Sequence, residues 1–169
     1  EAVSDGLTGL FNRRFFEEAL VREVERARRY GSQSALLLVD LDGFKAVNDA
    51  YGHDTGDKLL IAVTERLEQP LKGQYTLARI GGDEFVLVQS SPNQQRESAI
   101  VLANRLLEAI SAPYDINGHQ IVIGTSIGIA LAPNDGDTAD ELWKNADLAL
   151  YRVKSEGRNG YRLFEPEMN

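Results

Sequence analysis

The chain lacks several features that would define a class of protein. It has no cysteine, which excludes disulfides, zinc–thiolate sites and thiol nucleophiles. No apolar run approaches the roughly 20 residues that a membrane span requires, and no signal peptide is visible, so we expect a cytoplasmic protein. Basic residues are in the minority, with 18 Lys and Arg against 26 Asp and Glu. The resulting net charge of −8 argues against a general nucleic-acid binder, although metal ions and a few placed cations would still allow a nucleotide to bind.

Methionine is also scarce, because Met168 is the only one and the sequence lacks an initiator. We therefore expect a domain cut from a longer protein. The length of 169 residues suits one domain with a sizeable core. We predict a single domain over residues 1–169, in which 1–14 form an N-terminal segment and 165–169 begin a C-terminal linker.

Hydrophobic periodicity indicates helices and strands in mixed order. Helices are predicted at 11–30, 44–50, 54–67, 93–111 and 138–157. Strands are predicted at 35–39, 76–80, 85–88, 120–132 and 161–164, with a further hairpin over 114–119 whose Asn117-Gly118 pair is typical of a type I′ turn. Adjacent hairpins imply antiparallel pairing, so the pattern predicts an α+β fold with helices covering a central sheet.

Two acidic clusters follow predicted strands. The first is Asp83-Glu84, which ends a hairpin turn begun by Gly81-Gly82; we expect these glycines to adopt positive φ in a tight reversal. The second begins at Asp40, directly after the buried strand 35–39. If the two strands are neighbours, Asp40 and Asp83 converge at one end of the sheet.

Converging carboxylates at a sheet end are suited to binding Mg²⁺, which rarely uses a complete protein cage. The Leu41 carbonyl is a further candidate ligand. The alternatives are that Asp40 or Asp42 caps the following helix and that Asp83-Glu84 is a solvated turn. We expect Asp42 to be the cap of helix 44–50.

Four motifs in this order resemble those of the GGDEF family, the diguanylate cyclases. They are residues 5–14 (DGLTGLFNRR), 40–49 with 52–57 (DLDGFKAVND and GHDTGD), 81–85 (GGDEF) and 146–159 (ADLALYRVKSEGRN). The resemblance covers nearly the whole chain. It implies the nucleotidyl-cyclase variant of the ferredoxin-like fold, with a mainly antiparallel sheet, and GTP as the substrate.

The resemblance also implies roles for individual residues. Metal ions, Mg²⁺ or Mn²⁺, would be held by Asp40, Asp83 and the Leu41 carbonyl with support from Glu84, and Asp83 or Glu84 would be the catalytic base. The implied guanine readers are Asn48 and Asp57, with His53 either in the base pocket or in a local turn. The implied phosphate cradle comprises Gly43, Phe44, Lys45 and Gly82, and the β- and γ-phosphates would meet Lys154 and Arg158.

Asp57, Lys154 and Arg158 also have an alternative interpretation that needs no ligand. Asp57 could be a first-turn acid that favours the helix dipole. Lys154 and Arg158 lie four apart, hence on one face of the last predicted helix, and could be a solvated basic helix end.

The implied reaction condenses two GTP molecules into cyclic di-GMP and releases two pyrophosphates. Because one domain holds one GTP, turnover would require a homodimer. Many cyclases carry an Arg-x-x-Asp product-inhibition site before the hairpin, but here the corresponding residues are 72–75 (KGQY), so we expect no inhibition through that site. Residues 161–168 resemble the junction into an EAL phosphodiesterase domain. A catalytically silent GTP sensor that controls such a domain is therefore the main alternative, and an interaction module with a vestigial site is a third.

Overall fold

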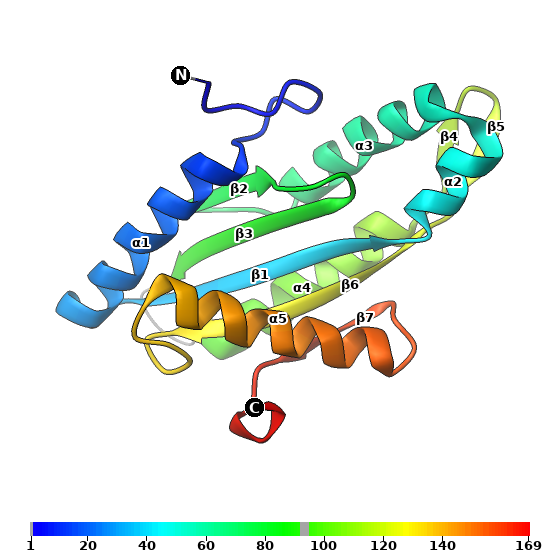
Figure 1. Cartoon of the computed structure of the whole chain (residues 1–169). Helices are drawn as coiled ribbons and strands as arrows, with labels where there is room; N and C mark the ends of the chain where they lie inside the picture. Colours follow the sequence, from blue (N-terminus) through cyan, green and yellow to red (C-terminus); the bar gives the residue numbers. More distant parts are fainter. Residues whose placement is uncertain (1, 92–94) are drawn as a thin grey trace.

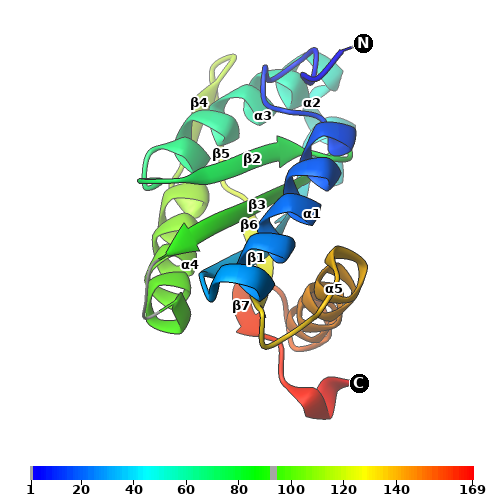
Figure 2. The same ribbon diagram turned by 90° about the vertical axis from the view of Figure 1, so that its left-hand side faces the viewer.

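A central five-stranded sheet lies between two layers of helices in the computed structural model, which describes residues 2–91 and 95–169 (Figures 1 and 2). The strand order is β2-β3-β1-β6-β7, and only the β6–β7 pair is parallel. The strands are β1 (Gln33–Asp42), β2 (Tyr75–Arg79), β3 (Glu84–Ser91), β6 (Gly124–Ala132) and β7 (Gly160–Leu163). The helices are α1 (Arg13–Tyr30), α2 (Phe44–Tyr51), α3 (His53–Glu68), α4 (Gln95–Ser111), α5 (Ala139–Ser155) and the 3-10 turn η1 (Pro166–Met168). The predicted α+β class is confirmed.

The middle strand, β1, separates two hydrophobic cores because its successive side chains point to opposite faces of the sheet. Leu36 and Leu38 pack in the core under α1 and α5. Leu37 and Val39 pack in the core under α3 and α4. Figure 2 shows these two helical layers on opposite sides of the sheet. Asp40 follows the alternation and therefore faces the same side as Leu38, toward α1 and α5.

A glycine on β6 allows α5 to lie very close to the sheet. A Cβ at Gly128 would be 2.4 Å from the backbone oxygen of Ala146 and 2.5 Å from the backbone nitrogen of Leu150. No larger residue fits without separating helix from strand, so Gly128 fixes the height of α5 above the sheet. The inward-facing residues of α5 are placed by this contact.

The predicted strand 120–132 is wrong, because the structure has two strands there. β5 (His119–Ile121) pairs with β4 (Tyr114–Ile116) in a separate two-stranded sheet, whereas β6 pairs with β1. Ile121 and Ile123 are buried while Val122 is 64% exposed. The alternation thus continues through the break, and periodicity could not reveal where the chain changes sheets.

Other boundaries differ by a few residues. The last helix ends at Ser155 rather than 157, because Gly157 has a φ of 113° that a right-handed helix cannot contain. The predicted start of the 93–111 helix falls partly on residues 93–94, which lie outside the described residues. Within the described ranges, no helix is long and apolar enough to cross a membrane.

Candidate active site

The two acidic clusters meet at one end of the sheet, as predicted. β1 and β3 are antiparallel neighbours, and their register places Asp40 opposite Glu84. The Leu41 amide donates to the Asp83 carbonyl at 3.1 Å, which joins the strand ends. Directly opposite residues in an antiparallel pair share a face, so Asp40 and Glu84 project toward the α1 and α5 side.

The glycines of the hairpin turn have a role other than the predicted one. Neither Gly81 nor Gly82 has a left-handed φ, so the expectation of positive φ is wrong. Instead, a Cβ at Gly81 would be 2.5 Å from the Glu84 carboxylate, so this glycine leaves room for that side chain. The Gly82 carbonyl accepts two hydrogen bonds from the Arg79 guanidinium, at 2.9 and 3.2 Å.

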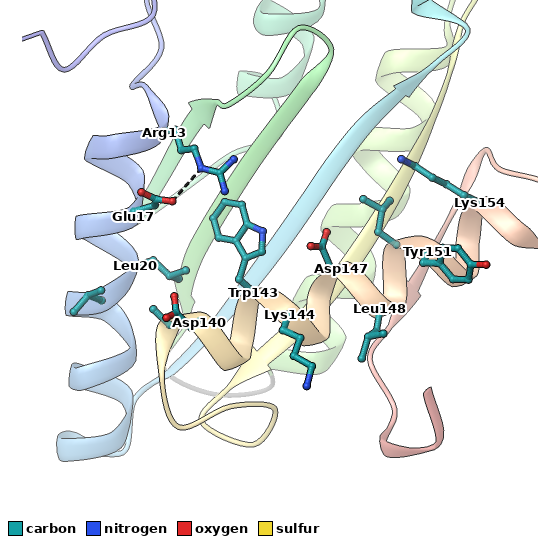
Figure 3. Close-up of a pocket in the computed structure, with 13 residues that line it drawn as sticks. Arg13, Glu17, Leu20, Asp140, Trp143, Lys144, Asp147, Leu148, Tyr151 and Lys154 are labelled. Atoms are coloured by element: carbon teal, nitrogen blue, oxygen red, sulfur yellow. Dashed lines mark hydrogen bonds and ion pairs between the residues drawn. The ribbon is translucent and has the colours of Figure 1, made fainter. Parts of the chain in front are cut away.

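A fourth carboxylate, Asp147 on α5, lies near these three. Burial raises the pKa of Asp83, of Glu84 and of Asp147 on α5, and repulsion from Asp40 is the second-largest cause of the rise. Asp147 was not predicted as a site residue from the sequence, although its position two helical turns before Lys154 places both residues on one face of α5. Figure 3 shows both side chains on the sheet side of α5, beside β1.

Lys154 supplies the countercharge. Its Nζ forms an ion pair with Oδ2 of Asp40, and it lowers the pKa of the three neighbouring carboxyl groups against the effect of burial. The Asp40 side chain is only 12% exposed, so this pair is largely shielded from water. The predicted phosphate ligand therefore lies next to the predicted metal ligand.

The residues at this edge fit a hard divalent cation. Among residues 2–91 and 95–169, no group of three or more His, Cys, Asp or Glu side chains is arranged to hold a metal alone. Mg²⁺ and Mn²⁺ commonly complete their shells with water and substrate oxygens, so one or two carboxylates suffice. Repulsion from Asp40 contributes to the raised pKa of Asp83 and Glu84, and Lys154 pairs with Asp40. Both observations indicate that positive charge is stabilised at this end of the sheet.

Asp42 does not cap a helix, which corrects the prediction. The N-cap of α2 is Gly43, with no side-chain cap. The Asp42 carboxylate accepts hydrogen bonds from the Ser126 hydroxyl at 2.9 Å and from the backbone N–H of Asn159 at 2.9 Å. It also pairs with Arg158 at 3.7 Å, and so it anchors the loop after α5 to the sheet.

Arg158 therefore lies in this loop and not on α5. Its backbone φ is 65°, beyond the end of the helix at Ser155, so the predicted shared helix face with Lys154 is wrong. Both residues nevertheless reach the same strand end, because Asp40 and Asp42 hold them there. The Arg158 side chain is 56% exposed.

The proposed base readers lie on α2 and α3, the two helices that follow the end of β1. Asn48 on α2 faces Gly56 on α3 so closely that a Cβ at Gly56 would be 1.7 Å from the Asn48 Oδ1. This Oδ1 is buried, and the described part of the chain offers it no hydrogen-bond partner. A buried amide oxygen without a partner is costly unless a ligand uses it. Asp57 and His53 are exposed in the first turns of α3.

The predicted phosphate cradle begins α2. Gly43 has a φ of 86°, a conformation that favours glycine, and turns the chain from β1 into the helix. Phe44 is 7% exposed and packs in the core with its side chain, so only its backbone is available to a ligand. Lys45 is exposed on α2.

An ion pair that the sequence analysis missed ties the N-terminal segment to the hairpin. Arg79 contacts Asp5 at 3.1 Å while it binds the Gly82 carbonyl. Burial alone would raise the pKa of Asp5, but hydrogen bonds from Thr8 and from Arg79 lower it. Residues 5 and 79 are far apart in sequence, so spacing carried no signal of this pair.

A groove of about 940 Å³ separates α1 from α5 and reaches the carboxylate edge (Figure 3). Trp143 lies in it under the guanidinium of Arg13, which is 5.3 Å from the ring centre. Asp147 and Lys154 line the end next to β1.

The chain is similar to known proteins in both sequence and fold. The family profile described as diguanylate cyclase, GGDEF domain, matches residues 2–160. The chain is 49% identical over 168 residues to the bifunctional diguanylate cyclase/cyclic di-GMP phosphodiesterase MucR of Pseudomonas aeruginosa, covering 99% of this chain and 24% of MucR. It is 40% identical over 164 residues to the cyclic di-GMP phosphodiesterase NbdA of the same organism, covering 97% of this chain and 21% of NbdA. The chain thus spans about a quarter or less of these relatives.

A solved structure matches the fold closely. The GGDEF domain of YfiN (TpbB) from Pseudomonas aeruginosa superposes with a TM-score of 0.92 at 36% identity, covering 98% of this chain and 96% of that one. The profile and the structure both extend over almost all of the sequence. The chain therefore belongs to the GGDEF domain family of diguanylate cyclases.

Proposed function

We propose that this domain condenses two GTP molecules into cyclic di-GMP in the cytoplasm, where GTP is available. One observation carries the proposal: the β1–β3 register brings Asp40 opposite Glu84, with Asp83 adjacent, at one end of the sheet. The ammonium group of Lys154 is bound to Asp40 there. Such an edge is suited to a metal-bound polyphosphate, and MucR, whose name includes this activity, is nearly half identical in sequence.

In this proposal Asp40, Asp83 and the Leu41 carbonyl hold Mg²⁺ or Mn²⁺, with Glu84 in support. The bound metal would lower the pKa of the attacking hydroxyl and neutralise charge on the phosphoryl oxygens. Lys154 and Arg158 would orient the β- and γ-phosphates, with Lys45, Gly82 and the backbone of Gly43 and Phe44 nearby. Asn48 and Asp57 would read the guanine, and His53 would line the base site.

The chemistry consists of two equivalent substitutions. The 3′ oxygen of one GTP forms a bond to the α-phosphorus of the other, and the bond from that phosphorus to the pyrophosphate oxygen breaks. The hydroxyl proton would pass to the carboxylate of Asp83 or Glu84 as general base. Pyrophosphate leaves with its charge balanced by Lys154 and Arg158.

A homodimer is required in this proposal, since each domain would present one GTP to the other. We also propose that residues 72–75 provide no product-inhibition site, because Lys72 and Tyr75 stand where an Arg-x-x-Asp pair would be needed. Both are exposed; Lys72 lacks the forked guanidinium of arginine and Tyr75 lacks a carboxylate.

The test is incubation of the purified dimer of this 169-residue chain with GTP and Mg²⁺, followed by measurement of pyrophosphate and cyclic di-GMP. We expect Asp83→Asn to abolish both products. Asp115→Asn, which removes an exposed carboxylate of β4, is the matched control and should leave the rate unchanged. Equal rates for the Asp83 variant and the unchanged chain would contradict the assigned site.

A second candidate is a GTP sensor that regulates an attached EAL phosphodiesterase domain. The identity of 40% to NbdA, which is named as a phosphodiesterase, favours it. A sensor would be stabilised by Mg-GTP, since a ligand that binds the native state raises the melting temperature, yet it would release no pyrophosphate. The same incubation therefore separates the two functions.

A further inference from the structure

The β4–β5 hairpin contacts the end of α2 and the start of α3 (Figure 1). Asn117 is at its tip and uses both ends of its side-chain amide. Its Nδ2 donates to Asp54 Oδ2 at 3.1 Å and to Thr55 Oγ1 at 3.0 Å. Its Oδ1 accepts from Lys58 Nζ at 2.7 Å. All three partners lie in the first two turns of α3.

The turn conformation explains how an exposed residue can make these contacts. Asn117 has a φ of 53° and Gly118 a φ of 80°, the left-handed pair of a type I′ turn. Asparagine tolerates this conformation better than most residues. Its amide is held at the tip by the backbone, and it provides a donor and an acceptor together, which aspartate and glycine cannot do.

Within α3 itself, Asp54 and Lys58 form an ion pair at 3.5 Å, but the first turn has no side-chain cap. Its N-cap is Gly52, which makes no side-chain capping bond. The side-chain amide of Asn117 therefore forms hydrogen bonds with the side chains at the start of α3, where the N-cap residue provides no side-chain bond. The same hairpin also contacts α2, because the His119 ring packs 4.3 Å from the ring of Tyr51, the last residue of that helix.

We propose that Asn117 is a positioning residue for guanine recognition. Asp57 lies between Thr55 and Lys58, two of the residues that Asn117 binds, so its place depends on the turn that Asn117 holds. Gly56 in that turn faces Asn48 on α2. The hairpin thus sets the relative position of the two helices that carry the base readers. This inference rests on the proposed function, in which Asn48 and Asp57 contact the guanine.

The test is the affinity of the chain for 3′-deoxy-GTP and for 3′-deoxy-ATP with Mg²⁺; neither analogue can be cyclised because both lack the attacking hydroxyl. Asn117→Gly keeps the turn conformation and removes the three hydrogen bonds. We expect the preference for guanine over adenine to fall about fivefold, as expected when a few exposed hydrogen bonds that orient a reader are lost. Gln120→Ala alters an exposed side chain of the same hairpin and should leave the preference unchanged.

The ratio of two affinities distinguishes positioning from stability, since a merely structural residue would lower the melting temperature and leave the ratio constant. An unchanged ratio in Asn117→Gly, in a chain that prefers guanine, would overturn this inference alone. Equal affinity of the unaltered chain for both analogues would overturn the proposed function, and this inference with it.

Discussion

Replacing Lys154 with methionine tests the electrostatics of the site most directly. The variant keeps the length of the side chain and removes the charge that pairs with Asp40. Loss of one partner costs about 3–5 kcal/mol in a buried pair and exposed pairs are worth about 0–1 kcal/mol. The Lys154 and Asp40 side chains are 32% and 12% exposed, between these limits. We expect the free energy of unfolding in a metal chelator to fall by about 2 kcal/mol.

For a domain of this size, that loss lowers the melting temperature by about 4–8 °C. Divalent metal should reverse much of it, because a cation at Asp40 replaces the missing ammonium. In the unaltered chain the same cation must first displace Lys154 from Asp40, so Mg²⁺ should stabilise it less. The variant therefore has the lower melting temperature in chelator and the larger increase when Mg²⁺ is added.

The assay is thermal unfolding in chelator and in Mg²⁺, without nucleotide. Lys144→Met is the control, since it removes an exposed lysine from the same helix. Equal gains from Mg²⁺ in Lys154→Met and in the unaltered chain would refute the idea that lysine and metal compete for Asp40. No loss in chelator would refute the estimate of the ion pair.

Three further changes test other parts of the structure. Asp83→Asn should stabilise the metal-free chain at pH 7, because the raised pKa means that ionising Asp83 costs folded-state stability. The gain should vanish below about pH 3, where the carboxyl is protonated in both states, and chemical denaturation at each pH measures it. Gly56→Ala should displace Asn48, and we expect a titration to show GTP binding weakened more than tenfold. The melting temperature should not fall, because alanine favours the helix by about 1 kcal/mol and the displaced Asn48 oxygen loses no hydrogen bond within the described residues. Gly128→Ala should destabilise the chain by more than about 2 kcal/mol in denaturant, because its Cβ meets the backbone of α5; an effect below 1 kcal/mol would show that α5 moves freely.

The strand-end carboxylates could be predicted because the argument needed only local facts. A run of five buried apolar residues identifies a central strand, and two such strands with acids at their ends place those acids together. The register of Asp40 and Glu84 confirms this expectation. The family motifs were sufficient to predict the fold class.

The errors have a common physical cause, which is contact between segments distant in sequence. Asp42 was assigned to the nearest helix, but Ser126 and Asn159 bind it instead. The strand predicted over 120–132 was assigned to one sheet, but β5 pairs with β4 and β6 pairs with β1. Periodicity and spacing describe one segment at a time, so they do not predict which distant groups compete for a side chain.

Lys154 illustrates the same principle at the centre of the proposed mechanism. In the nucleotide-free fold its ammonium neutralises Asp40, and in the proposed complex it binds the phosphates. A cation at Asp40 takes over the charge that Lys154 supplies, so a triphosphate that attracts Lys154 also makes Asp40 more available to metal. Nucleotide and metal should therefore bind cooperatively, each raising the affinity of the other by the same factor. An edge of this kind remains folded without ligands and still presents its carboxylates once Mg-GTP arrives.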